Sequence, residues 1–465
     1  MKRLLAIAVL CACAVAPCAP GRAADDEDGA PVDWIGVPGA SAERVDEPVW
    51  GGKVMVYRVG RRDADPVVLV HGIGQDGARD WRYVIQELAR DHDVWALDLP
   101  GFGESDKGNN LYSPERYVRV LEAVVGRRVG RPFVLIGHSM GAAVSLEYAA
   151  TYPKRVARLI LVDMAGVLHR AIFAESMGRL GVEQATGFYP EEGSWVGSVM
   201  RRMLAKVEPL AGASAAVLRT AETRQRFLNG DPGAIAGYAL VEHDFGRALR
   251  AVKAPTLLVW GSEDRIAPMR TAQVALATIP GARLRIIQGV RHEPMTQVPQ
   301  RFNEIVRDEL DGRAGGVQYE SPAGAFKSDR VGRCKGVRGR GFSGDYERIE
   351  LDRCPEAELT GARVGTLVVT DSTVHVLDSQ IRDGVQAMRS RVDITGGVAG
   401  GSPPFVMDTS TVDVAGARIE AEDAVARNIG RERSTLRFSV SEVSRDGGTP
   451  SPVHRVVRID PDKDW

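Results

Sequence analysis

The segment that most constrains the fold is Gly137-His138-Ser139-Met140-Gly141, which lies between a buried strand and a helix. The apolar residues 133–136 precede it, and a run of small, helix-forming residues follows without a loop. A serine at such a corner is held in a sharp turn with its hydroxyl exposed above the sheet, and the flanking glycines avoid clashes with the neighbouring strand and helix. We therefore predict that Ser139 is a nucleophile, provided that a base and an acid follow it.

The candidate base is selected by chain order. A serine hydroxyl needs a base, the base needs a carboxylate to orient it, and in this fold class the acid and then the histidine follow the serine. The histidines that follow an acid at the end of "TLLVWG" are His292, His375 and His454, and the last two lie in a separate C-terminal region. We therefore predict His292, just beyond the last apolar strand, as the base.

The candidate acid is one of the carboxylates that directly follow a predicted strand. Glu263 and Asp264 both follow "TLLVWG", and we predict Asp264 as the acid with Glu263 as a solvated neighbour. Asp163, at the end of "LILVD", remains the alternative because some enzymes of this kind place the acid one strand earlier.

The donors for an oxyanion are expected at two backbone positions. The turn His71-Gly72-Ile73-Gly74 follows the first strong strand, where an N–H can point into the site. We predict that Ile73 supplies one donor and that Met140, the residue after the nucleophile, supplies the other. His71 is expected to be structural.

Strand-like and helix-like segments alternate from residue 53 to about residue 310. Apolar runs such as "VVLVHG", "DVWALDLPG" and "LILVD" are separated by segments with helical spacing, for example residues 81–91 and 113–128. Continuous apolar strands that alternate with helices indicate a parallel sheet covered on both faces. Residues 165–249 interrupt this alternation with helical segments and no clear buried strand. We interpret them as a lid, with ordinary covering helices as the alternative.

The C-terminal region has a different pattern, which follows a glycine-rich linker at residues 313–330. Segments with alternating apolar residues begin at Ser372, Ser390, Ser410 and Ser434, at intervals of 18, 20 and 24 residues. Repeats of this length with one strand at the same place predict the stacked coils of a parallel β-helix, and an antiparallel sandwich is the alternative. The chain of 465 residues thus divides into an α/β domain at 45–312 and an all-β repeat domain at 331–465.

The first 24 residues predict export. Lys2 and Arg3 precede an apolar run that is too short to span a bilayer, and small residues follow it. We therefore expect a periplasmic or secreted protein with no transmembrane anchor. A loose match to a bacterial lipoprotein signal around Cys11 leaves lipidation as an alternative.

The remaining cysteines bear on a disulfide, and the net charge bears on the kind of molecule that the protein binds. Cys334 and Cys354 remain after cleavage of the signal, and in an exported chain they predict one disulfide, with two free thiols as the alternative. The formal net charge is -1, from 60 basic and 61 acidic side chains. This balance gives no electrostatic signature of a nucleic-acid partner.

Taken together, these motifs resemble those of the α/β-hydrolase family. The segments that carry the resemblance, in family order, are "LVHGIG", "LDLPGFGESD", "GHSMGA", "GSEDRIAP" and "RHEPMTQVPQRF", between about residues 54 and 310. The resemblance implies a doubly wound, mostly parallel sheet with a helical cap between the sixth and seventh core strands, where residues 165–249 fall. It also implies the branch with a serine nucleophile, not the branch with an aspartate. No cofactor and no metal site are expected.

Several functions use these catalytic parts. We favour hydrolysis of a carboxylic ester, with a small-molecule acyl substrate, because this reaction makes the fewest chemical demands on the site. Carbon–carbon bond hydrolysis and acyl transfer are the alternatives. A hypothesis of another class is an envelope-binding protein whose repeat region binds a polysaccharide or a partner protein, although a stabilising or spacing module is favoured for that region. The aromatic residues that could line an acyl pocket are Phe173, Phe188, Tyr189, Trp195, Phe227 and Tyr238.

Overall fold

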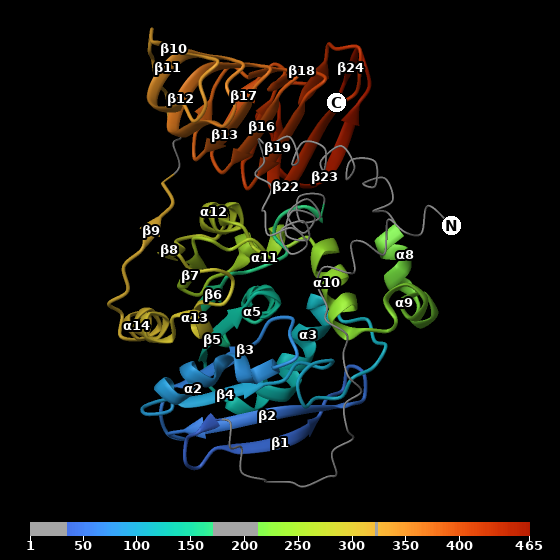
Figure 1. Cartoon of the computed structure of the whole chain (residues 1–465), viewed down its shortest axis with the longest axis vertical. Helices are drawn as coiled ribbons and strands as arrows, with labels where there is room; N and C mark the ends of the chain where they lie inside the picture. The colour runs from blue at the N-terminus through green and yellow to red at the C-terminus, as the bar shows by residue number, and fades with distance from the viewer. Residues whose placement is uncertain (1–34, 171–212, 321–323) are drawn as a thin grey trace.

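The computed structural model describes residues 35–170, 213–320 and 324–465, which form two regions, each built around its own sheet (Figure 1). The predicted signal segment and its cysteines lie outside the described residues. Among the residues that are described, no helix is both long and apolar enough to cross a membrane.

The N-terminal region is built on a nine-stranded sheet with the order β1-β2-β4-β3-β5-β6-β7-β8-β9. The strands from β4 to β8 in this order pair in parallel, and the pairings at both edges are antiparallel. This confirms the predicted doubly wound, mostly parallel sheet. The strands are β1 (Ser41–Asp46), β2 (Lys53–Gly60), β3 (Pro66–Val70), β4 (Asp93–Leu97), β5 (Phe133–His138), β6 (Val156–Val162), β7 (Thr256–Gly261), β8 (Arg283–Ile287) and β9 (Val317–Gln318).

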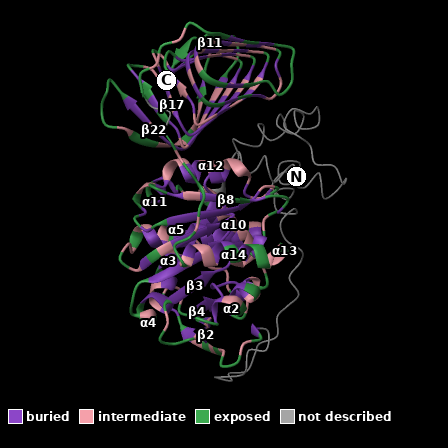
Figure 2. Cartoon of the chain, turned by 90° about the vertical axis from the view of Figure 1, so that its left-hand side faces the viewer, coloured by how far each residue is buried: buried purple, intermediate pink, exposed green. Residues whose placement is uncertain are grey.

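Helices cover both faces of this sheet because its central strands are apolar on both sides. Every residue of β3, β5 and β7 is buried. In β3, for example, Val67 and Leu69 pack into one hydrophobic cluster and Val68 and Val70 into another. The first cluster contains residues of α2 (Arg82–Leu88), α13 (Pro294–Gln297) and α14 (Pro299–Leu310), and the second contains residues of α3 (Pro114–Leu121), α5 (Met140–Thr151), α11 (Gly246–Ala251) and α12 (Met269–Thr278). Figure 2 shows the resulting buried interior.

The elements that the structure describes in the insertion between β6 and β7 are helices, at the position predicted for the cap. Its helices are α8 (Ala213–Arg219), α9 (Ala221–Leu228) and α10 (Pro232–Glu242), and α11 then returns the chain to the sheet. Residues 171–212 lie outside the described residues, and so do Phe173, Phe188, Tyr189 and Trp195, four of the aromatic residues proposed to line a pocket.

His243 joins the end of the insertion to the core. It follows α10, and its Nδ1 lies 3.0 Å from Glu115 Oε1 on α3 while its Nε2 lies 2.6 Å from Glu147 Oε1 on α5. One imidazole therefore bridges the cap to two core helices, and α5 is the helix that begins directly after Ser139.

The C-terminal region is all-β, and its strands stack in parallel, coil upon coil, as in a parallel β-helix. Val331 pairs with Arg348 and Thr411 pairs with Thr435, so one coil takes between 17 and 24 residues. The parallel pairing excludes the antiparallel sandwich. The strands are β10 (Val331–Lys335), β11 (Gly341–Asp352), β12 (Ala357–Thr370), β13 (Thr373–Leu377), β14 (Gln380–Ile381), β15 (Val385–Met388), β16 (Arg391–Thr395), β17 (Val398–Gly401), β18 (Phe405–Asp408), β19 (Thr411–Ala415), β20 (Arg418–Ala421), β21 (Ala426–Asn428), β22 (Ser434–Arg445), β23 (Ser451–Ile459) and β24 (Lys463–Asp464).

Three columns of strands make up this stack: β13-β16-β19-β22, β14-β17-β20-β22 and β15-β18-β21. At the C-terminal end the direction changes, because β23 pairs with β22 and β24 pairs with β21 in antiparallel fashion. At the N-terminal end a disulfide joins Cys334 of β10 to Cys354, just after β11.

A ladder of buried serines runs through the stack and explains the periodicity seen in the sequence. The backbone N–H of Ser372 donates to Ser390 Oγ at 3.1 Å, that of Ser390 to Ser410 Oγ at 3.0 Å, and that of Ser410 to Ser434 Oγ at 3.3 Å. Each serine therefore satisfies a backbone donor of the preceding coil, which requires one serine per coil at the same place.

The expected linker at residues 313–330 contains β9, which pairs with β8 of the N-terminal sheet. The N-terminal sheet also begins at Ser41, slightly before the boundary expected at residue 45. The division into 45–312, 313–330 and 331–465 stays a prediction.

Candidate active site

Ser139 occupies the sharp corner between β5 and α5. Its backbone has φ 51° and ψ −117°, a conformation that non-glycine residues rarely adopt and that is found at functional sites. The flanking glycines make the corner sterically feasible. A Cβ on Gly137 would lie 2.4 Å from the carbonyl oxygen of Gly141, and a Cβ on Gly141 would lie 2.3 Å from that of His71.

His292 and Asp264 form a hydrogen-bonded chain with this serine. His292 Nε2 lies 2.9 Å from Ser139 Oγ, and His292 Nδ1 lies 2.8 Å from Asp264 Oδ2. The second oxygen, Asp264 Oδ1, accepts the backbone N–H groups of Ile266 at 2.8 Å and Ala267 at 2.9 Å. Asp264 is 5% exposed, so its carboxylate is fixed in a dry setting by three donors. This geometry brings the three residues expected from the sequence together.

The two other candidate acids lie in different settings. Glu263 is exposed. Asp163 is fully buried and its Oδ1 accepts the N–H of Gly261 at 2.9 Å, but His292 does not bond to it. Burial raises the pKa of Asp163 well above its usual range, and the neighbouring charge of Asp264 raises it further. Both influences favour the protonated form of Asp163.

The turn after β3 lies directly beside the serine. A Cβ on Gly72 would lie 3.0 Å from Ser139 Cβ, so Ile73 follows at the edge of the site. No residue in the described part of the chain accepts a hydrogen bond from the backbone N–H of Ile73 or of Met140. Both groups are thus available to an oxygen bound above Ser139.

His71 holds this turn in place. Its Nδ1 lies 2.6 Å from the carbonyl oxygen of Gly72, and its Nε2 accepts the N–H of Leu99 at 2.9 Å. Burial lowers the pKa of His71, so the ring is neutral and one nitrogen can accept. Both ring nitrogens serve backbone groups, which is the structural role expected for this residue.

His138 supports His292, and sequence reasoning missed this role. Its Nε2–H donates to the backbone carbonyl of His292 at 2.7 Å. Burial lowers the pKa of His138 well below its usual range, and the nearby His292 lowers it further, so the ring is neutral. The available signal was its place beside the serine in Gly-His-Ser-Met-Gly, but a contact across 154 positions cannot be read from spacing.

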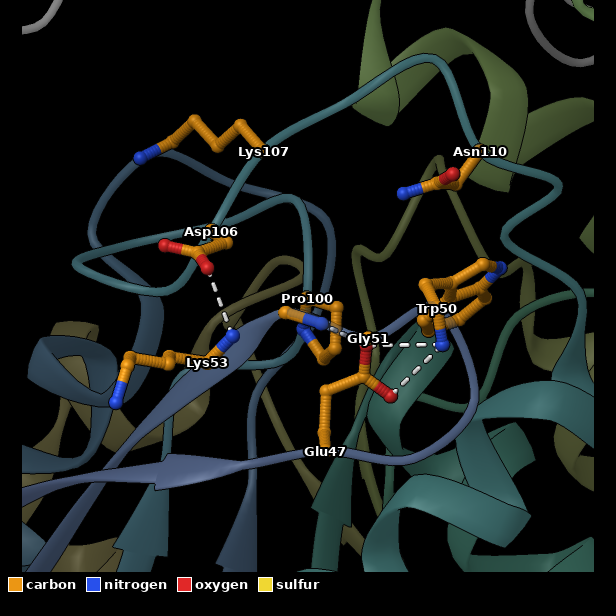
Figure 3. Close-up of a pocket in the computed structure, with 9 residues that line it drawn as sticks. Glu47, Trp50, Gly51, Lys53, Pro100, Asp106, Lys107 and Asn110 are labelled. Atoms are coloured by element: carbon orange, nitrogen blue, oxygen red, sulfur yellow. Dashed lines mark hydrogen bonds between the residues drawn. The ribbon is translucent and has the colours of Figure 1, made fainter.

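A small cavity of about 170 Å³ lies elsewhere in the N-terminal region and includes none of these residues (Figure 3). Its acidic groups already have partners: Glu47 accepts the N–H groups of Val49, Trp50 and Gly52, and Asp106 accepts that of Lys53. The acidic groups that line this cavity therefore hold the backbone of a turn. The residues that line it are Glu47, Trp50, Gly51, Gly52, Lys53, Pro100, Asp106, Lys107 and Asn110.

Comparison with known proteins places the chain in a family. A model of the alpha/beta hydrolase family matches residues 67–305, about half of the chain. A 2-hydroxy-6-oxononadienedioate/2-hydroxy-6-oxononatrienedioate hydrolase of Cupriavidus pinatubonensis is 29% identical over 256 residues, which cover 53% of this chain and 87% of that protein. The acetyltransferase component of the acetoin cleaving system of Pseudomonas putida is 30% identical over 262 residues, which cover 55% of this chain and 66% of that protein.

Among solved structures, a thermophilic esterase from Thermogutta terrifontis aligns with a TM-score of 0.43 at 23% identity, over 59% of this chain and all of that one. The family match spans Ile73, Ser139, Met140, Asp264 and His292. The chain therefore belongs to the alpha/beta hydrolase family and is an enzyme of that class.

Proposed function

We propose that this enzyme hydrolyses a carboxylic ester through Ser139, His292 and Asp264. The observation that carries the proposal is the continuous chain of hydrogen bonds from Ser139 Oγ through both nitrogens of His292 to Asp264 Oδ2, at 2.9 and 2.8 Å. This is the arrangement in which a base can activate a hydroxyl while a fixed carboxylate holds the correct tautomer of the imidazole.

In the first half of the reaction, His292 Nε2 takes the proton of Ser139 as its Oγ attacks the ester carbonyl carbon. The N–H groups of Ile73 and Met140 bind the oxyanion that forms, an effect of about 3 kcal/mol per donor. The tetrahedral intermediate then collapses, the alkoxide leaves with the proton held by His292, and an acyl-Ser139 ester remains.

In the second half of the reaction, water takes the place of Ser139 as the nucleophile and attacks the acyl-enzyme. His292 takes a proton from water as the oxygen attacks the acyl carbon, and the proton then returns to Ser139 Oγ as the carboxylic acid leaves. Asp264 stays charged throughout and stabilises the imidazolium, which its two backbone donors and its hydrogen bond to His292 support.

Carbon–carbon bond hydrolysis is the second candidate, and the name of the Cupriavidus relative favours it. The same serine, histidine and oxyanion donors would serve a carbonyl flanked by a carbon leaving group, and the acetyltransferase relative extends this to acyl transfer. Ester hydrolysis is preferred because an alkoxide leaving group needs only the proton of His292, whereas a carbanion must be stabilised by further groups.

The proposed setting of the enzyme is outside the cytoplasm, either periplasmic or secreted. The sequence of residues 1–24 and the joined cysteines of the repeat region support it, because disulfides persist in oxidising compartments. Sequencing of the mature N-terminus from whole and fractionated cells tests this part. An intact Met1 in the cytoplasmic fraction would contradict it.

The test of the function is hydrolysis of a chain-length series of p-nitrophenyl esters by the wild type and by Ser139→Ala. We expect Ser139→Ala to abolish turnover. Asp264→Asn should lower kcat on the order of 10⁴-fold, whereas the matched change Glu263→Gln should leave it unaltered. If the wild type hydrolyses no ester faster than Ser139→Ala, the ester proposal fails, and vinylogous diketones with the same pair of proteins test the second candidate.

A further inference from the structure

The β-helix packs on the two helices that flank β7, the strand leading to Asp264. Figure 1 shows α11 and α12 directly below the β-helix. From α11, Arg250 donates to the carbonyl oxygen of Val440 at 3.3 Å and pairs with Glu442 at 3.3 Å. The two regions therefore share an interface of specific contacts.

Arg270 makes the most extensive of these contacts from α12. Its Nε donates to Thr395 Oγ1 at 2.9 Å, and its Nη2 lies 2.9 Å from Asp413 Oδ1 and 3.1 Å from the carbonyl oxygens of Asp413 and Ile394. The guanidinium thus hydrogen-bonds to both β16 and β19, which belong to consecutive coils. The Asp413 side chain is 0% exposed and that of Arg270 17%, so this is a desolvated ion pair with a fixed geometry.

The surfaces around this ion pair are fitted closely. Gly416 turns with φ +63°, and a Cβ there would lie 3.1 Å from Val274 on α12. Val440 also adopts φ 53°, which is strongly disfavoured for a β-branched residue. It is 2% exposed and packs within the hydrophobic cluster of the N-terminal region, so docking compensates a strained backbone.

Arg270 is connected to Asp264 by a short segment that is held by backbone hydrogen bonds. Residues 264–270 leave β7, present the N–H groups of Ile266 and Ala267 to Asp264 Oδ1, and enter α12 at Met269. The carbonyl oxygen of Ala267 also accepts from Trp260 on β7 at 2.8 Å. One end of the segment is thus held by the sheet, and the other end is held by the β-helix through Arg270.

We propose that Arg270 is a positioning residue and that the β-helix is a fixed part of the active site, because it holds the segment whose amides orient Asp264. This inference rests on the proposed role of Asp264 in the serine hydrolase. The repeat region then has a role beyond stability or spacing: it sets the orientation of the carboxylate that holds His292.

The test uses the full-length protein with two interface variants. Arg270→Met with Asp413→Asn removes both members of the ion pair, and the other buried carboxylate near Arg270, Asp393, keeps its hydrogen bonds from Arg391. Arg250→Met is the matched control, because it removes an arginine from the same interface at a helix that does not lead from Asp264. A third variant, Arg270→Lys, keeps the positive charge but lacks the planar guanidinium that hydrogen-bonds to two coils at once.

The first readout is hydrogen–deuterium exchange of residues 262–268, which needs no substrate. We expect the amides of Ile266 and Ala267 to exchange on the order of tenfold faster in the double variant than in the wild type, and at the wild-type rate in Arg250→Met. Equal protection in the double variant and the control overturns the inference, whatever the enzyme hydrolyses.

The second readout is the ester assay. The double variant should lose on the order of tenfold in kcat with little change in KM, because the substrate contacts remain and the acid is misplaced. The kcat of Arg270→Lys should lie between that of the wild type and that of the double variant. The kcat of Arg250→Met should equal that of the wild type. A double variant with unaltered kcat refutes the positioning role, whereas a wild type no better than Ser139→Ala refutes the ester proposal.

Discussion

The His243 bridge between the cap and the core should make stability depend on pH in a defined direction. Burial lowers the pKa of His243, but the hydrogen bonds that its ring donates to Glu115 and Glu147 outweigh this and raise it from 6.5 to about 9. A folded pKa above the unfolded one means that the charged bridge stabilises the protein fully below about pH 6.5 and that this contribution is lost as the pH rises through about 9.

The size of the effect follows from the same shift. At ~1.4 kcal/mol per pKa unit, the rise from 6.5 to about 9 sets an upper limit near 3 kcal/mol. The Glu115 side chain is 55% exposed, so solvent screening reduces this to about 2 kcal/mol. The lowered pKa of Glu115, about 2, reports the same contact from the other side and is not added.

Urea unfolding of the wild type and His243→Gln at pH 6 and pH 10 measures this contribution. We expect His243→Gln to lower the free energy of unfolding by about 2 kcal/mol at pH 6 and by almost nothing at pH 10. His92→Gln is the control, because His92 pairs with its neighbour Asp91 within one loop, and the change should be below about 1 kcal/mol at both pH values. A loss for His243→Gln that is equal at pH 6 and pH 10 would show that the ring acts by packing alone and would refute the reasoning.

Two further predictions concern residues beside the triad. Asp163→Asn should retain wild-type kcat, since the raised pKa of Asp163 favours its protonated form and His292 bonds to Asp264 instead; a loss as large as that of Asp264→Asn would show that Asp163 acts as the acid. His138→Phe should lower kcat about tenfold, which corresponds to one lost hydrogen bond of about 1.4 kcal/mol to the carbonyl of His292. Its urea midpoint should change little, and an unaltered kcat would show that His292 needs no such support.

The sequence was sufficient for the features that arise from local chemistry. The buried strands are continuous apolar runs, and the corner at Ser139 is marked by glycines whose absence of side chains is sterically required. The spacing of Ser372, Ser390, Ser410 and Ser434 reflects one hydrogen bond per coil, so the repeat was visible without the fold.

Features that depend on pairing between distant segments were less predictable. The sequence favoured Asp264 as the partner of His292 but left Asp163 open, because both follow strands, and it is the three-dimensional path of residues 288–292 that brings His292 to Asp264. The pairing of β9 with β8, inside the expected linker, rests on a strand of two residues that has no sequence signature. The hydrogen bonds of Arg270 to Thr395 and Asp413 connect residues that are more than 120 positions apart in the sequence.

The antiparallel strands at the C-terminal end of the β-helix also govern whether molecules can join end to end. A stack of parallel coils ends in a row of open N–H and C=O groups, which is a template for further strands and hence for fibre growth. Here β23 runs back along β22, and β24 runs back along β21, so the last coil offers its hydrogen bonds to strands of opposite direction in its own chain. The last coil therefore offers a second molecule fewer open hydrogen-bonding groups than a bare end would, which limits the addition of further coils.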